Sequence, residues 1–144
     1  ALRIKQELDK RPFLLNSTHV LLENQPALVN PIMKTVQIIL LSYFSFKNTE
    51  EKKIIVKNVN ARMKEKLPEK DERWEESKEK LTYENKIANI SQKNKYTRRK
   101  KLCYYYSLMR LQNSPTMKDF LLQHKKKDDL TDSYLMCVDW LQRK

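Results

Sequence analysis

The fold is decided by residues 17–46, which read STHVLLENQPALVNPIMKTVQIILLSYFSF. The first six residues form a short apolar run, and its length and β-branched side chains predict a buried strand. Asn30 and Pro31 predict the start of a helix, because asparagine is a preferred N-cap and proline suits the first helical position. Apolar residues then recur at helical spacing, so this helix should pack on a sheet.

Flanking segments extend this pattern in both directions. Residues 1–10 predict a helix that ends before Pro12, and residues 53–59 predict a second strand. Further helices are predicted over 97–112, 115–123 and 129–142, with Thr97 as one cap and Asp128 or Asp129 as another. The order helix, strand, helix, strand, helices predicts an α/β domain whose sheet lacks one edge.

The composition restricts the class of protein. With 144 residues, 40% of them hydrophobic, the chain suits a single domain over 1–144, and no apolar run approaches the roughly 18 residues of a membrane span. Two cysteines exclude a disulfide scaffold and suit a reducing, intracellular compartment. Glycine is absent, although hairpins and tight turns normally use it. We therefore expect a partial sequence whose missing part holds the glycine-bearing hairpins.

Positive charge dominates the chain and is unevenly distributed. Thirty Lys and Arg against 18 Asp and Glu give +12, and residues 47–101 carry 18 of the basic and 10 of the acidic groups. This balance favours a polyanionic partner, nucleic acid first and an anionic membrane surface second. No predicted helix pairs a basic face with a strongly apolar one, which disfavours the membrane. Residues 60–96 predict a charged, solvated helical insertion or a partly mobile arm, with Trp74 as its main large anchor.

Glu23 is the first candidate site residue. A carboxylate directly after a buried strand is costly unless it is hydrogen-bonded or neutralised by a cation. In open α/β sheets ligands collect at the carboxyl ends of strands, which favours a binding role. The alternative is a solvated turn residue.

The second candidate is the acidic cluster Asp128-Asp129-Leu130-Thr131-Asp132. Asp129 and Asp132 are three residues apart and share one helical face at a helix start, where the dipole favours ionised carboxylates. Mg²⁺ prefers such hard oxygen ligands. The alternative is that one aspartate caps the helix and the other interacts with its dipole, which leaves the three preceding lysines unexplained.

The third candidate is the basic run from Lys93 to Lys101, which contains no acid. Positive charge at a helix start opposes the dipole, whereas a phosphate bound there would account for it. The alternative is a solvated basic face. Tyr104, Tyr105 and Tyr106 are predicted to pack rather than to stack on bases, and His19 and His124 have no evident catalytic partner.

Two motifs together resemble one family. Val20-Leu21-Leu22-Glu23-Asn24-Gln25-Pro26, followed by Asn30-Pro31-Ile32-Met33-Lys34, resembles the second acidic motif of the poxvirus-type Holliday junction resolvases, which are related to bacterial RuvC. Lys125-Lys126-Lys127-Asp128-Asp129-Leu130-Thr131-Asp132-Ser133 resembles their last motif. The similarity runs over essentially the whole chain, and the ordered pair of motifs is specific.

This resemblance implies a ribonuclease H-like fold, a homodimer, and Mg²⁺-dependent hydrolysis of four-way and other branched DNA, with Mn²⁺ as a substitute. It implies that Glu23, Asp129 and Asp132 are the metal-binding and catalytic carboxylates, that Asp128 assists or caps, and that Lys100 or Lys101 lies near the scissile phosphate. DNA contacts are expected from the other basic residues of these motifs, namely Lys34, Lys93, Lys95, Arg98, Arg99, Lys125, Lys126 and Lys127.

The chain departs from the family in one respect. The family's first catalytic carboxylate lies on an N-terminal strand, and this sequence begins where the first helix would. Two expectations follow: a viral endonuclease that acts where viral DNA is replicated in the infected cell, or an inactive ribonuclease H-like module that binds nucleic acid or has a structural role.

Overall fold

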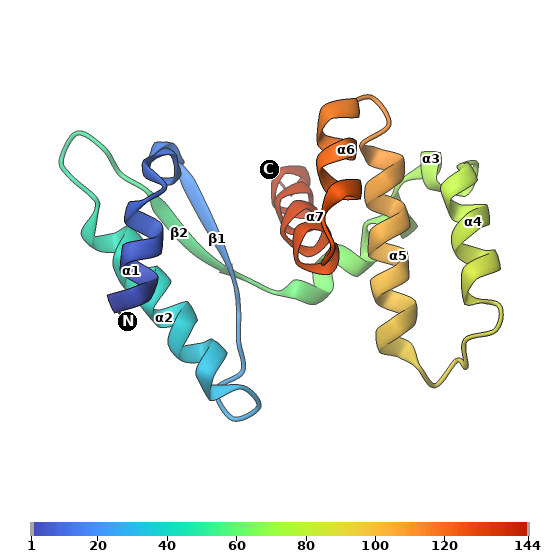
Figure 1. Ribbon diagram of the computed structural model, residues 1–144, viewed down its shortest axis with the longest axis horizontal. Helices are drawn as coiled ribbons and strands as arrows, with labels where there is room; N and C mark the ends of the chain where they lie inside the picture. The colour runs from blue at the N-terminus through green and yellow to red at the C-terminus, as the bar shows by residue number, and fades with distance from the viewer. Residues whose placement is uncertain (1, 144) are drawn as a thin grey trace. The chain divides into compact units, whose positions relative to one another are not determined.

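The computed structural model describes residues 2–143, which form a mostly helical α/β protein with one two-stranded parallel sheet (Figure 1). The chain divides after Asn60 into two compact units. Within the described residues, no helix combines the length and the apolar character needed to cross a membrane. The predicted α/β class is confirmed at this level.

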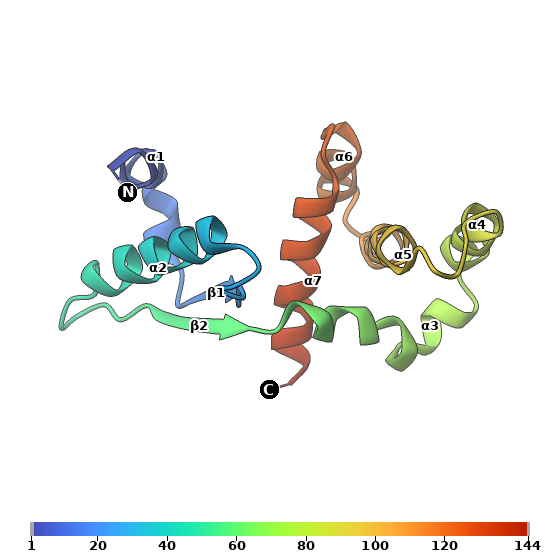
Figure 2. The same cartoon turned by 90° about the horizontal axis from the view of Figure 1, so that it is seen from below.

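The first unit is built around a strand–helix–strand motif. Its elements are α1 (Leu2–Asp9), the 3-10 helix η1 (Pro12–Asn16), β1 (His19–Glu23), α2 (Pro31–Phe46) and β2 (Ile55–Val59). The two strands are parallel, with Glu23 opposite Val59 at their carboxyl ends. The helix α2 covers one face of the sheet, and α1 lies against α2 (Figure 2).

Local sequence signals account for α2. The Asn30 side chain accepts a hydrogen bond from the backbone N–H of Met33 at 3.1 Å, so the predicted cap is confirmed. Tyr43 and Phe44 are buried on the helix face that contacts the sheet. The Tyr43 hydroxyl donates to Asp9 at 2.9 Å and thereby fixes α1 to α2.

The second unit is helical. Its elements are η2 (Ala61–Lys66), η3 (Pro68–Lys70), α3 (Glu72–Glu75), α4 (Lys78–Ile87), α5 (Lys95–Arg110), α6 (Pro115–Gln123) and α7 (Asp128–Gln142). Its core holds Leu67, Trp74, Cys103, Tyr106, Met109, Leu135 and Val138. Trp74 is 4% exposed, so its predicted role as an anchor is confirmed. The charged segment is therefore an integral part of this core.

Two predicted helix caps are wrong. Asn94, three residues before Thr97, caps α5 by accepting from the Thr97 backbone N–H at 3.2 Å. The residue before α7 is Lys127, and no side chain caps that helix; Asp128 and Asp129 lie inside its first turn instead. Carboxylates there interact favourably with the helix dipole without capping it.

The backbone is unstrained throughout residues 2–143. No residue in that range has a positive φ, and no peptide bond is cis. Both cysteines are free thiols, with Cys103 buried and Cys137 exposed.

Candidate functional site

Glu23 ends β1 with its side chain exposed to solvent within the first unit. The backbone N–H of Asn24 continues the sheet by donating to the Val59 carbonyl at 2.9 Å. Glu23 is thus held by a regular strand at the carboxyl edge of the sheet, where parallel strands present ligand-binding groups.

A buried glutamine fixes the turn that follows Glu23. Gln37 of α2 is 5% exposed, and its side-chain amide donates to Asn58 of β2 at 2.6 Å. Its carbonyl oxygen accepts from the Gln25 backbone N–H at 3.2 Å and from Lys34 Nζ at 2.9 Å. No role was predicted for Gln37 from the sequence, although a single polar residue within an apolar run is itself a signal of a buried hydrogen bond.

In the second unit, Asp132 lies between two lysine ammonium groups. Lys100 Nζ donates to Asp132 Oδ2 at 2.6 Å, and Lys64 Nζ is 3.1 Å from Oδ1. The second contact is an ion pair without hydrogen-bond geometry, which leaves the buried Oδ1 without a hydrogen bond among the described groups. Lys64 is 6% exposed and was not predicted, because nothing in the Lys- and Glu-rich segment distinguishes a buried lysine.

Lys100 is held in its charged form by this arrangement. Burial alone would lower the pKa of Lys100, but the hydrogen bond and the charge of Asp132 outweigh it and raise the pKa. The Tyr96 ring, 5.7 Å away at its centroid, adds a cation–π contact. Lys100 is therefore a permanent positive charge beside Asp132.

The three aspartates of α7 have different surroundings. Asp128 and Asp132 are one helical turn apart, and the charges of both act on Lys100. The Asp129 side chain is 72% exposed, and Lys126 lies 3.2 Å from its carboxylate. Within residues 2–143 no three His, Cys, Asp or Glu side chains form a group that could hold a metal ion.

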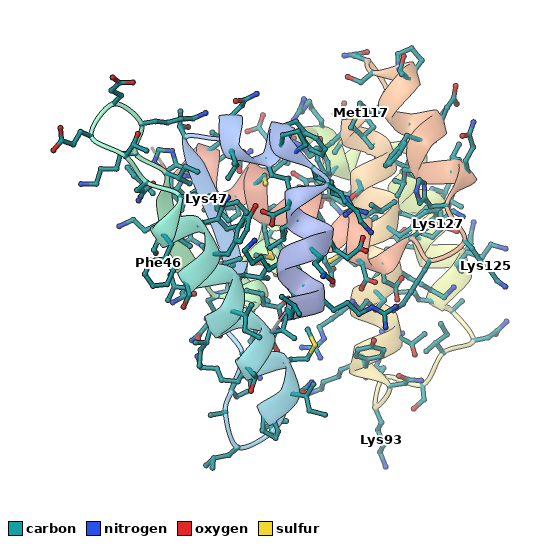
Figure 3. The ribbon with its side chains drawn as sticks, turned by 60° about the vertical axis from the view of Figure 1, so that its left-hand side comes forward. Phe46, Lys47, Lys93, Met117, Lys125 and Lys127 are labelled. Atoms are coloured by element: carbon teal, nitrogen blue, oxygen red, sulfur yellow. The ribbon has the colours of Figure 1, made fainter. Side chains whose placement is uncertain are left out.

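A groove of about 370 Å³ adjoins this ionic cluster. We call it the basic groove; it is lined by Lys100, Lys101, Tyr104, Tyr105, Lys125 and Lys127. The first four lie on one side of α5, because Tyr104 follows Lys100, and Tyr105 follows Lys101, by four residues, about one helical turn. The last two come from the connection between α6 and α7, where Figure 3 labels them. Asp128 also contributes to the lining.

The other predicted DNA contacts are divided between structural and exposed positions. Arg98 donates to the backbone carbonyls of Ile87 and Ile90 at 3.3 and 3.0 Å, which stabilises the end of α4. Arg99 is 3.5 Å from Glu65. Lys95, the first residue of α5, and Lys93, which precedes the helix and is labelled in Figure 3, are exposed. Arg98 thus has a structural role that accounts for its position.

Asp71 is a second well-organised acid, which the sequence analysis missed. Its carboxylate accepts from Arg73 at 2.8 Å, from the Tyr106 hydroxyl at 2.9 Å and from Arg110 at 3.2 Å. The hydrogen bond from Arg73, helped by that from Tyr106, lowers the pKa of Asp71 to about 2. Because Asp71 also caps α3, this network stabilises the second unit.

The donor chemistry of α7 is compatible with Mg²⁺. This ion usually takes one or two carboxylates and completes its shell with water and phosphate, and Asp128 and Asp132 offer such oxygens on one face. The positive charge beside Asp132 currently comes from Lys64 and Lys100. A divalent cation would compete with these ammonium groups for the same carboxylate.

Comparison with known proteins yields one distant relative. The chain is 30% identical over 133 residues to the uncharacterized protein L451 of Acanthamoeba polyphaga mimivirus. The match covers 90% of this chain but 30% of that protein, so the chain spans less than a third of its relative's length. No protein-family model and no solved structure matches the chain.

Proposed function

We propose that this chain belongs to a Mg²⁺-dependent endonuclease that cleaves four-way and other branched DNA, with a ribonuclease H-like fold and a homodimeric assembly. The observation that carries the proposal is that Asp128 lines the basic groove and that Lys100, which also lines it, donates a hydrogen bond to Asp132. Hard oxygen ligands and several ammonium groups thus lie together, which is what a scissile phosphate and its metal ion require.

A viral setting is part of the proposal. The mimivirus relative and the resemblance to resolvases of large DNA viruses support a role in viral genome recombination or replication. The two free thiols suit the reducing interior of an infected cell, at the site of viral DNA replication.

Each residue has a definite task in this scheme. Asp128 and Asp132 would hold Mg²⁺, together with Asp129 and Glu23 as the further carboxylates that the resemblance implies; the ion when bound would activate water and stabilise the leaving oxygen. Lys100 orients Asp132 and neutralises phosphate charge, and Lys101 contributes a second positive charge to the groove. Lys64 pairs with Asp132 from the buried side, with Nζ 3.1 Å from Oδ1.

Cleavage of a synthetic four-way junction by the full-length protein tests the proposal. With Mg²⁺, we expect Asp132→Asn to lower the rate by more than about 100-fold, since residues that merely support a ligand already cost 10–100-fold. Asp129→Asn should also impair cleavage. Because the Asp129 side chain is exposed, this substitution should not disturb folding. The matched control is Asp119→Asn, an exposed carboxylate on α6, which should cleave normally.

Two results would count against a nuclease. Equal cleavage by the wild type and both α7 variants would remove the assigned carboxylates from the reaction. Junction binding without any metal-dependent cleavage would favour a second candidate, a nucleic-acid-binding module that has no catalytic activity. That candidate is favoured by the lysine partners of Asp129 and Asp132, which balance both charges without a metal.

A further inference from the structure

We propose that the basic groove binds an unpaired stretch of DNA, with a base against Tyr104 and the adjoining phosphates on Lys101 and Lys125. This inference deepens the proposed function, on which it rests for the choice of DNA, by naming single-stranded segments as the part of a branched substrate that this surface recognises. It also assigns Tyr104 a binding role, whereas packing was predicted from the sequence.

The two groove tyrosines have different surroundings. Tyr105 packs against the core of the second unit and is thereby fixed. The Tyr104 and Tyr105 rings meet in a T-shaped contact, with ring centroids 5.1 Å apart and planes at 72°. Tyr104 is half-buried in the groove wall, so one aromatic ring is held in place by another while it lines an open hollow.

The lysines of the groove also differ from one another. Lys100 is engaged by Asp132, and Lys127 donates to the His124 carbonyl at 2.6 Å. Over the part of the chain that the structure describes, Lys101 and Lys125 make no hydrogen bond or ion pair. These two ammonium groups therefore remain available for phosphates.

This combination favours an unpaired strand over a duplex. Bases in a duplex are stacked on one another, so their faces cannot reach a tyrosine in a hollow. Proteins that bind single strands combine a basic groove with aromatic platforms for the bases. Lysines alone would suffice for contacts to a duplex backbone.

Binding of two matched oligomers to the full chain tests the inference. Fluorescence anisotropy without Mg²⁺ compares oligodeoxythymidine of about 12 nucleotides, within the usual site sizes, with an abasic strand of equal length. We expect the wild type to bind the thymidine strand about 5- to 30-fold more tightly, the lower part of the range for stacking on one aromatic residue. Tyr104→Phe should keep this preference, and Tyr104→Leu should remove it while leaving abasic binding unchanged.

Charge variants separate phosphate contacts from base contacts. Lys101→Gln and Lys125→Gln should weaken both oligomers equally and reduce the salt dependence of binding. Lys86→Gln, an exposed lysine on α4, should leave both affinities unchanged. Equal affinity of the wild type for the two oligomers, or a thymidine preference that persists in Tyr104→Leu, would overturn the inference. Because no metal is present, failure of the nuclease proposal would not alter these results.

Discussion

At the level of single residues, the partners of each carboxylate determine its behaviour. Asp132 lies between two ammonium groups, one of them almost fully buried. Removing one member of such a cluster leaves the others desolvated and unpaired, which is more costly than the cluster's net contribution. Substitutions at Asp132 will therefore affect folding as well as any chemistry, which is why the exposed Asp129 is an essential second variant.

Asp71 gives a pH-dependent prediction. Its pKa is lowered from 3.8 to about 2 in the folded protein, so its stabilising effect is complete above pH 4 and is lost as the pH falls towards 2. At pH 7 we expect Asp71→Asn to lower the free energy of unfolding by about 2 kcal/mol. Urea unfolding at several pH values measures this difference.

The difference in unfolding free energy between the wild type and Asp71→Asn should change over the same pH range. The stability difference between the two proteins should shrink as the pH is lowered from 4 to 2. Glu76→Gln, an exposed acid next to α3, should show little difference at any pH. A wild-type advantage that persists below pH 2 would contradict the assigned role of the Asp71 carboxylate.

At the level of elements, the start of α5 gives a second stability prediction. Asn94 accepts the hydrogen bond that begins this helix, and loss of such a cap typically costs about 0.5–2 kcal/mol. We expect Asn94→Ala to lower the free energy of unfolding, measured in urea, by that amount, and Thr97→Ala to have a smaller effect because its side chain does not cap. The opposite order would mean that Thr97 starts the helix after all.

Local signals explain which elements could be predicted. Asn30 and Pro31 stabilise the start of the helix in which they lie, so the position of α2 could be predicted from the sequence. Asn94 and Thr97 are both acceptable caps for α5, and only the backbone path chooses between them. The burial of Lys64 could not be predicted, because it depends on Asp132, which is far along the chain.

At the level of the whole molecule, the division after Asn60 predicts two units that differ in stability. All buried residues of the larger core belong to the second unit, whereas the first unit buries three residues in its core around a two-stranded sheet. Sheets of two strands are marginal alone. We expect residues 61–144 to unfold cooperatively when heated, followed by circular dichroism, and residues 1–60 to show no cooperative transition. A cooperative transition only in the shorter fragment would contradict this assignment of the cores.

The candidate site shows that sequence patterns identify its charged residues but not the contacts between them. The acidic residues of α7 and the lysines before them were evident as a motif, and the structure places Asp128, Lys125 and Lys127 at one groove. Sequence spacing favoured Asp129 as the partner of Asp132, because residues three apart share a face. In the structure, Lys100 on α5 interacts with Asp128 and Asp132 instead. The residue pattern of α7 alone could not predict this, because it contains no information about the helix that packs beside it.

The absence of positive φ angles over residues 2–143 has a practical consequence for mutagenesis. Wherever a protein relies on left-handed turns, replacing the residue there disturbs the main chain as well as the side chain. Here no turn in that range needs a left-handed residue. Alanine substitutions at the non-proline positions of residues 2–143 will therefore not be confounded by the loss of a left-handed turn.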